Sequence, residues 1–469
     1  MKRWIAVLLS LLILSALFFA LQLFQFFSRD LLAGSEERIA RYRMGDAELN
    51  ILDPAGRPIP SALVRVDQIS HHFIFGCEIY QLGLIQDPAE RKLYLDSWTE
   101  LFNTGITVLY WRYYEPEPGK YRDREMRELL ELFQGREVKF LIHPMLDGNE
   151  WGSPAWLKIR PGLEDQIHQH LAKQFAAFQS RVDYWVAVNE ATNAWPLNPV
   201  GAWIKSLGPV KSTAQALSWA RELNPSGTYI VNDYNITRLN DFIFLLCYPS
   251  LALRLLYQDR GQPKMKHYGL LQGLEKEKVV PDLIGIETHM HITNLRLWFV
   301  EYIINKYRRF GIPLYFSEVS VLSGENRLVA DVTATYSEDW WPSTKEGEIA
   351  QAEYLEDFYT YVFSRPEVAG VTYWCFSDRY SFISSPCGLL RRDLSPKPAY
   401  DRLHRLIREK WHTRMQSRTD SEGKLRLRAF YGKYLVTVQT ETGEELSYHF
   451  DLSPTGPNSF LFSLPKSGP

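Results

Sequence analysis

Two glutamates stand at the ends of apolar runs and could act as a catalytic pair. Glu190 closes the run 182–190, and Glu318 closes the run 314–318. Runs so rich in β-branched and aromatic residues indicate strands that are buried on both faces. Hydrolysis of a glycosidic bond needs two such carboxyl groups, one to protonate the leaving oxygen and one to attack or to activate water. Either glutamate alone could form an ordinary salt bridge, but the pair favours catalysis, with Glu190 neutral and Glu318 ionised.

The elements that must position this pair recur along the chain as eight strand-like runs. Amphipathic, helix-like stretches such as 126–133 and 349–363 lie between them. The eight runs are 73–76, 106–111, 138–143, 184–190, 229–233, 283–289, 314–318 and 370–374. Eight alternating strand–helix units predict an α/β fold, a (β/α)8 TIM barrel over residues 73–412. A doubly wound open sheet is the alternative, but no glycine-rich phosphate turn follows the first run.

Polar and aromatic side chains gather at the C-terminal ends of these runs. They are Trp111, His143, Asn189, Glu190, Asn232, Asp233, Glu287, His289, Glu318 and Trp374. In a TIM barrel these strand ends form one rim around one pocket, so the pattern predicts a single active site. Trp111 and Trp374 could stack on a sugar or belong to the core. Glu115 is expected to brace a rim loop and not to be catalytic.

A metal site is the alternative for part of this rim. His289 and His291 are two apart on an extended segment, and His143 could join them. We favour an ordinary polar role for His291, because a metal hydrolase also needs a bridging base and an acidic ligand. The four cysteines fit neither a disulfide-rich scaffold nor a zinc motif, although Cys375 and Cys387 could pair if their geometry allows. We therefore expect no metal and no cofactor.

The first 27 residues predict a membrane anchor. Residues 4–27 carry no charge and are long enough to cross a bilayer as a helix. A cleaved signal peptide is the alternative, but the segment ends in the bulky residues 23–27 and not in a small-x-small site. Lys2 and Arg3 favour a cytoplasmic N-terminus, although arginines also follow the segment. We expect the catalytic body to be held at the membrane, outside the cytoplasm.

The remaining segments predict small accessory elements. Charged residues 28–45 are expected to form a helical spacer. Alternating strands predict a small β element at 46–72 and a C-terminal β-module at 413–469. The 53 basic and 55 acidic residues give a net charge of -2, without the basic stripe of a nucleic-acid-binding protein. The expected partners are a polysaccharide or oligosaccharide and a membrane, and not nucleic acid.

In their order along residues 73 to 408, the motifs together resemble glycoside hydrolase family 10, the retaining endo-β-1,4-xylanases. The segments that carry the resemblance are Trp111 with Glu115-Pro116, His143, Asn189-Glu190-Ala191, Asn232 to Asn235, 284–289, Ser317-Glu318, 370–374, 378–381 and 396–400. The resemblance implies a (β/α)8 barrel and double displacement with net retention. It implies Glu318 as the nucleophile and Glu190 as the acid/base. The substrate contacts that we expect are His143, Asn189, His289, Trp374, Tyr110, Glu287, Trp111, Asn232, Tyr234 and Phe382.

Five positions depart from the family pattern, all on the glycone side of the cleft. Tyr110 stands where the family has a sugar-binding Lys, and Asp147 where it has a Trp. Glu287 replaces a Gln, Phe382 a second Trp, and Ser320 an Asp. The catalytic pair is kept while the sugar-binding surround is rebuilt. We therefore expect cleavage of xylan or a related β-1,4-glycan, with a sugar-binding barrel of little turnover, or a transglycosylase on another β-glycan, as alternatives.

Overall fold

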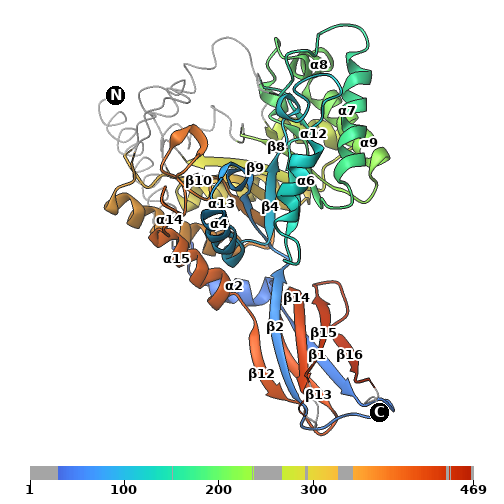
Figure 1. The fold of residues 1–469 in the computed structure, drawn as a ribbon, viewed down its shortest axis with the longest axis vertical. Helices are drawn as coiled ribbons and strands as arrows, with labels where there is room; N and C mark the ends of the chain where they lie inside the picture. Colours follow the sequence, from blue (N-terminus) through green and yellow to red (C-terminus); the bar gives the residue numbers. More distant parts are fainter. Residues whose placement is uncertain are drawn as a thin grey trace, which may run out of the picture.

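The computed structural model describes residues 30–149, 152–234, 236, 267–290, 294–325, 342–439, 443 and 445–465. These residues form two parts, a barrel ringed by helices and a smaller β-module at one end of it (Figure 1). The predicted membrane anchor, residues 1–27, lies outside the described residues, as do Asn235 and His291. Within the described part, no helix is both long enough and apolar enough to cross a membrane.

Eight parallel strands close into the predicted barrel. They are β3 (Ile74–Glu78), β4 (Thr104–Val108), β5 (Lys139–His143), β7 (Tyr184–Asn189), β8 (Thr228–Asp233), β9 (Leu283–Met290), β10 (Leu314–Val321) and β11 (Val368–Tyr373). Pairing of β11 with β3, and of β5 with β7, completes the ring. A two-residue strand, β6 (Leu146–Asp147), continues the pairing along β7 beyond the end of β5. The barrel is thus confirmed, and the open-sheet alternative is wrong.

Helices cover the outside of this ring. The longer ones are α4 (Pro88–Leu101), α6 (Asp123–Glu131), α7 (Leu163–Phe178), α8 (Pro199–Leu207), α9 (Pro209–Leu223), α12 (His267–Glu277), α13 (Leu297–Tyr307), α14 (Lys345–Phe363) and α15 (Pro398–His404). Two of these helices illustrate side-chain capping at their starts. Asp87 accepts the amide of Glu90 at 2.9 Å before α4, and Thr344 accepts that of Gly347 at 3.0 Å before α14.

The strands are apolar on both faces because both faces are covered. Every residue of β10 is buried, as the unbroken apolar run predicts. The barrel interior holds one cluster that includes Ile74, Ile106, Leu141, Val186 and Tyr315, and a second, larger cluster fills the layer between strands and helices. The rim is therefore carried on a packed and rigid scaffold.

The two terminal β elements form one module. Its strands are β1 (Met44–Leu52), β2 (Leu63–His71), β12 (Arg414–Arg418), β13 (Lys424–Phe430), β14 (Gly432–Gln439), β15 (Glu445–Leu452) and β16 (Ser459–Ser463). One sheet has the order β13-β1-β16 and the other β12-β2-β14-β15. Each sheet thus combines an N-terminal strand with C-terminal ones, and their buried alternate residues share a core of their own.

The segment before β1 is docked on the barrel. It contains α2 (Ser35–Tyr42), followed by Arg43. The Arg43 guanidinium donates to the carbonyls of Phe363 and Val368, both at 2.7 Å, and Arg38 Nε donates to Ser364 Oγ at 3.2 Å. Burial lowers the pKa of Arg43 to about 10, although Glu367 opposes the shift. The described part of the expected spacer is therefore anchored to the C-terminal end of α14 and the loop before β11.

A buried ion pair holds the loops that follow β10 and β11. Lys397 Nζ lies 2.7 Å from Asp378 Oδ2, and neither side chain is more than 2% exposed. The same Nζ donates to Ser323 Oγ at 2.8 Å, and the Gly388 amide donates to Asp378 Oδ1 at 2.8 Å. These bonds join the start of α15 to two rim loops. Removing one partner of such a pair would leave a buried charge uncompensated.

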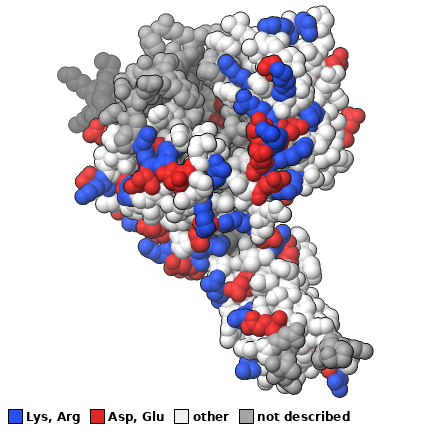
Figure 2. Space-filling model, viewed as in Figure 1, with Lys and Arg blue, Asp and Glu red and all other residues white. Residues whose placement is uncertain are grey.

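Two further points of the sequence analysis concern cysteines and charge. Cys375 and Cys387 are both buried free thiols, so the disulfide considered from their spacing is not formed. On the face in Figure 2, the basic and acidic side chains of the described residues are interspersed and do not form a single-sign stripe.

Candidate active site

Glu190 stands immediately after β7 in an unusual backbone conformation. Its φ of 49° and ψ of 38° lie in the left-handed region, where residues other than glycine are uncommon and often functional. The conformation is held from both sides, because the Glu190 amide donates to the Asn232 carbonyl at 3.0 Å and the Asn193 amide donates to the Glu190 carbonyl at 2.9 Å. The strand end therefore presents the Glu190 side chain at the rim.

The Asn232 side chain, at the end of β8, links the rim residues of three strands. Its Nδ2 lies 2.8 Å from each of three oxygens, Asn189 Oδ1, Glu287 Oε1 and Glu318 Oε1. Ser317 Oγ donates to its Oδ1. A glycine makes this arrangement possible, since a Cβ at Gly285 would lie 2.4 Å from Asn232 Oδ1. The structure thus brings Asn189, Asn232, Glu287 and Glu318 together, as predicted.

Two imidazoles face Glu318, which is buried on β10. His289 Nε2 lies 2.9 Å from Glu318 Oε2, and His143 Nε2 lies 3.4 Å from Oε1. His289 Nδ1 lies 2.8 Å from Ser320 Oγ. Burial by itself would raise the pKa of Glu318, but the two imidazoles and the Asn232 amide outweigh burial and hold this pKa below its ordinary value. Glu318 is therefore ionised at neutral pH.

Glu190 has the opposite electrostatic environment. Burial raises its pKa well above the ordinary value, and the negative charges of Asp147, Asp233 and Glu318 raise it further. The protonated form of Glu190 is therefore favoured more strongly than that of an ordinary glutamate. Two carboxyl groups of one rim, with pKa values displaced in opposite directions, have the properties of a proton donor and a nucleophile.

Aromatic rings wall this group of polar residues. Trp374 lies with its ring centre 5.2 Å from that of His143, and Phe382 stacks on His289 at 5.2 Å with 22° between the planes. Tyr110 packs edge-on against His143 at 6.3 Å. Tyr234, directly after β8, is 42% exposed on the rim. These four residues, all predicted as substrate contacts, place aromatic rings beside the polar residues at the mouth of the barrel.

The prediction of Trp111 as a substrate contact is wrong. Its side chain is 3% exposed, Nε1 donates to Glu115 Oε2 at 2.8 Å, and the ring stacks on His170 of α7 at 3.9 Å. A short helix, α5 (Trp111–Tyr114), starts at this residue, and its ring lies in the outer layer between strands and helices. Glu115 also accepts the Gly119 amide at 2.7 Å, so it braces the loop as expected.

Two further buried carboxyl groups lie at strand ends, Asp147, which the resemblance placed on the glycone side, and Glu78, which was not predicted as a site residue. Asp147, on β6, accepts from the Asn149 amide at 2.7 Å and from Asn189 Nδ2 at 3.1 Å. Glu78, at the end of β3, accepts the Phe376 amide at 3.0 Å. Burial raises the pKa of each to about 7. The strand-end rule would have found Glu78 had the first run been extended by two residues, from 76 to 78.

The metal alternative depends on His291, which lies outside the described residues. Within the part of the chain that the structure describes, no group of three or more His, Cys, Asp or Glu is arranged to hold a metal ion. The two histidines nearest Glu318 instead have their Nε2 atoms directed at its carboxylate.

A parallel barrel with a carboxyl pair at the C-terminal ends of β7 and β10 has the architecture of a glycoside hydrolase. Residues 67–245 and 253–406 match the family model of glycosyl hydrolase family 10. The chain therefore belongs to glycosyl hydrolase family 10, and the resemblance seen in its motifs is confirmed.

The similar proteins include xylanases and an anti-sigma factor. Endo-1,4-beta-xylanase B of Thermotoga neapolitana is 23% identical over 341 residues, which are 68% of this chain and 85% of that protein. Anti-sigma-I factor RsgI6 of Acetivibrio thermocellus is 23% identical over 431 residues, which are 89% of this chain. The chain spans only 48% of the length of that second relative.

Solved structures share the fold at low identity. Xylanase 10B from Thermotoga petrophila in complex with xylobiose has a TM-score of 0.53 and 20% identity, covering 72% of this chain and 95% of its own. A GH10 endoxylanase from a sugarcane soil metagenome has a TM-score of 0.56 and 19% identity, covering 71% of this chain and 97% of its own. At this identity the likeness establishes the barrel fold alone.

Asp147 is expected to make stability depend on pH. Its pKa is about 7 in the folded chain and about 3.9 in an unfolded chain, so the folded chain holds more protons between these values. The free energy of unfolding should therefore fall as the pH rises from about 4 to about 7. An Asp147→Asn variant cannot ionise and should lose less stability over this range. Urea denaturation at a series of pH values measures the difference.

The control for this experiment is Glu128→Gln on α6, which removes an exposed carboxylate and should follow the wild type at every pH. Parallel curves for the wild type and Asp147→Asn between about pH 4 and about pH 7 would contradict the assignment.

Proposed function

We propose that this chain is a retaining glycoside hydrolase that cleaves β-1,4 bonds in xylan or a related β-glycan, with Glu318 as nucleophile and Glu190 as acid/base. The observation that carries the proposal is the arrangement of the rim, where two imidazoles and the Asn232 amide face the Glu318 carboxylate and Glu190 stands at the end of β7. The opposite displacement of the two pKa values agrees with this arrangement. Membership of glycosyl hydrolase family 10 and the names of the xylanase relatives support the substrate class.

The geometry suggests how each step proceeds. The ionised Glu318 carboxylate attacks the anomeric carbon, while Glu190 gives its proton to the departing glycosidic oxygen. The product is a sugar ester of Glu318, with the former leaving group released as an alcohol. Water then attacks the ester as Glu190 takes its proton, which restores both groups and the original anomeric configuration.

The charge of Glu318 couples the two steps. In the free site this negative charge is one of the causes that raise the pKa of Glu190. Once Glu318 is esterified the charge is gone, so the pKa of Glu190 falls. The lower pKa keeps Glu190 ionised in the ester intermediate, so that it can act as a base towards water. When Glu318 regains its charge the pKa of Glu190 rises again, and Glu190 keeps the proton that it has taken.

The residues around the pair set the sugar preference. Glu287 and Asp147 lie in this rim, and burial raises the pKa of both, to about 7 for Asp147. In their neutral forms they can donate hydrogen bonds to sugar hydroxyls. When ionised they repel other anions. We therefore infer a preference for neutral sugars at this position, with Trp374 and Phe382 against the ring faces.

A second candidate function is a sugar-binding barrel with little turnover. Tyr110 occupies the position of the family's sugar-binding Lys, and a relative that matches 89% of this chain is named an anti-sigma factor and not a xylanase. Calorimetric binding of xylo-oligosaccharides without release of product from any β-glycan would favour this candidate. Transfer of the sugar to an added alcohol instead of water would indicate a transglycosylase.

We further propose that residues 1–27 anchor the chain and leave the barrel outside the cytoplasm. The apolar segment 4–27 supports the proposal. Protease added to intact cells that express the chain should digest the barrel, while a cytoplasmic marker protein stays intact. A barrel that is protected until the cells are lysed would contradict this location.

Substitution of Glu318 tests the proposed function. The full chain, in a sugar-free nonionic detergent, is incubated with a panel of β-glycans, and the product anomer is followed by NMR. The β-anomer should form first, because two displacements retain the configuration. Glu318→Ala should lower kcat by about a thousandfold or more, since no ester can form. Glu117→Gln removes an exposed glutamate of a rim loop and serves as the control.

Two outcomes would contradict these roles. An α-anomer as first product would exclude double displacement, and unchanged turnover in Glu318→Ala would exclude Glu318 as the nucleophile.

The pH profile of kcat/KM tests the division of roles. Because the pKa of Glu318 is held below its ordinary value, activity should persist down to about pH 4. Because the pKa of Glu190 is raised, activity should fall only where Glu190 loses its proton, well above that range.

Glu190→Gln should abolish the basic limb of the profile. It should also slow the cleavage of xylan more than that of an aryl glycoside, whose leaving group needs less protonation. A basic limb that survives in Glu190→Gln would assign it to another group.

A further inference from the structure

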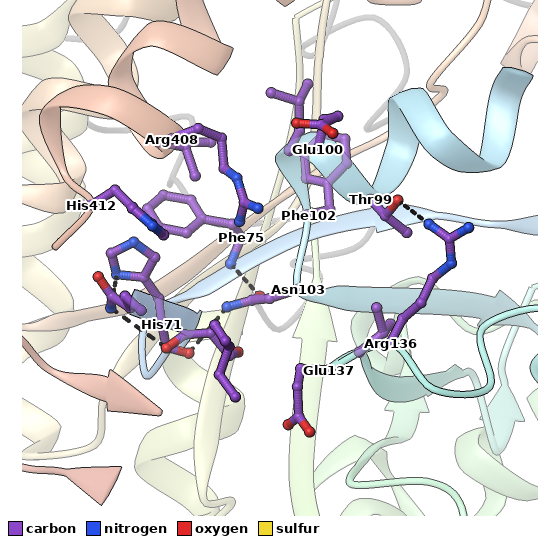
Figure 3. Close-up of a pocket in the computed structure, with 16 residues that line it drawn as sticks. His71, Phe75, Thr99, Glu100, Phe102, Asn103, Arg136, Glu137, Arg408 and His412 are labelled. Carbon is purple, nitrogen blue, oxygen red and sulfur yellow. Dashed lines mark hydrogen bonds between the residues drawn. The ribbon is translucent and has the colours of Figure 1, made fainter. Parts of the chain in front are cut away.

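A cavity of about 250 Å³ lies between the β-module and the barrel, at the end opposite to the rim (Figure 3). The module contributes the end of β2, including Ser70 and His71. The barrel contributes Asn103, which immediately precedes β4. The last helical segment, η4 (Arg405–Lys410), contributes Arg408, and His412 follows it. Nothing in the proposed hydrolysis uses this cavity.

His71 presents a buried N–H group that makes no hydrogen bond of normal geometry to a described residue. Gln68 Oε1 accepts the Thr413 amide at 3.1 Å, which directs the Gln68 NH2 group to His71 Nδ1 at 3.2 Å. An NH2 group only donates, so Nδ1 is the acceptor and Nε2 carries the hydrogen. His71 is 8% exposed, and Nε2 is buried without a hydrogen-bond partner, although the Ile407 carbonyl lies near enough to raise the pKa of the ring.

The neighbouring His412 is in a similar position. Its Nδ1 is also buried, and it has no hydrogen-bond partner among the described residues. Burial lowers the pKa of His412 to about 4, and the positive charge of Arg408 acts in the same direction. Burial, then the charges of His412 and Arg408, lower the pKa of His71 to about 3. Both imidazoles are therefore neutral at neutral pH, and each can offer one N–H group.

Arg408 supplies a positive charge that forms no ion pair with a described residue. Its guanidinium makes no hydrogen bond or ion pair with any residue that the structure describes. Arg136 and Glu137 form ion pairs with residues outside the wall, while Glu100 contacts the imidazole of His404, which is charged only when protonated. Arg136 pairs with Asp96 at 2.9 Å, Glu100 with His404 at 3.4 Å, and Glu137 with Lys433 at 2.9 Å. Figure 3 shows His71, His412 and Arg408 on one side of the cavity, with Arg136 on the other.

We infer that this cavity binds a small oxyanion, a carboxylate or a phosphate, held by the Arg408 guanidinium and the free N–H groups of His71 and His412. Such a ligand consists of acceptors only, which is what the vacant donors of the wall require. Guanidinium matches the geometry of both anions and forms charge-assisted hydrogen bonds with them. Because the ligand would contact β2 of the module and η4 behind the barrel, binding would hold the two parts together.

The proposal is tested by anion binding to the full chain in sugar-free nonionic detergent. Sodium phosphate, sodium acetate and sodium D-glucuronate are titrated separately by calorimetry, at an ionic strength kept constant with sodium chloride. At least one should bind with a stoichiometry near one and should raise the melting temperature as its concentration rises. Phosphate alone would identify a phosphate site, acetate and glucuronate a carboxylate site, and glucuronate alone a site for a sugar acid.

The decisive comparison uses two arginines of the same helical segment. Arg408→Gln should weaken binding about tenfold or more, since it removes charge-assisted hydrogen bonds. Arg405→Gln makes the same change at an exposed position outside the cavity and should bind as the wild type does. In proton NMR, the ring signals of His71 and His412 should shift on addition of the anion in Arg405→Gln but not in Arg408→Gln. Circular dichroism shows that both variants are folded.

The proposal is overturned if none of the three anions binds the full chain. It is equally overturned if Arg408→Gln and Arg405→Gln bind alike, because binding would then reflect surface charge and an adventitious ion only. Since substrate turnover is not a readout here, failure of this proposal would leave the proposed hydrolase function untouched.

Discussion

The amide of Asn232 constrains the electrostatic state of the whole rim. An NH2 group has two hydrogens, but three oxygens lie 2.8 Å from it, and two of them belong to the carboxyl groups of Glu287 and Glu318. Two atoms at 2.8 Å from one nitrogen are at most 5.6 Å apart. Two full charges so close in a buried site would repel strongly. One negative charge at Glu318, facing two imidazoles, and a neutral Glu287 resolve the conflict.

This constraint explains why the family's catalytic pair tolerates a rebuilt surround. An added carboxyl group at Glu287 keeps the hydrogen-bonding role of an amide as long as it holds its proton. Burial and the neighbouring acids favour that form by raising its pKa. The same acids raise the pKa of Glu190. The position of each carboxyl group therefore decides its protonation. The neighbouring acids favour a proton on Glu190 and Glu287, and the two imidazoles favour an ionised Glu318.

The sequence was sufficient for the barrel and for most of the rim. Strands buried on both faces leave an unbroken apolar run, and a polar residue where the run stops marks the strand end. This is why Asn189, Asn232, Glu287 and Glu318 were found. Trp111 was misplaced because a helix begins at that residue and its ring lies in the outer layer. Asp147 was placed near the cleft by the resemblance alone, because β6 has only two residues and leaves no run.

Contacts between distant segments could not be predicted. The strands of the β-module alternate as expected, but nothing in a single strand indicates that β1 pairs with β13 and β16. The cavity behind the barrel could not be predicted for the same reason, since its wall combines residues near 70, 100, 136 and 410. Its unpaired arginine and histidines look like ordinary polar residues until the segments are brought together.

The interleaved module has a consequence for the order of folding during synthesis. The strands β1 and β2 are synthesised first, but their partner strands begin only at Arg414. Between the end of β2 at His71 and Arg414, 414 minus 71, or 343, residues must be synthesised. At about 5 to 20 residues per second this delay is roughly 17 to 70 s. During that time the apolar faces of two unpaired strands stay exposed while the barrel folds behind them. While the chain is being synthesised, the apolar faces of β1 and β2 therefore need protection from aggregation. In the folded protein the same faces are buried in the core of the β-module.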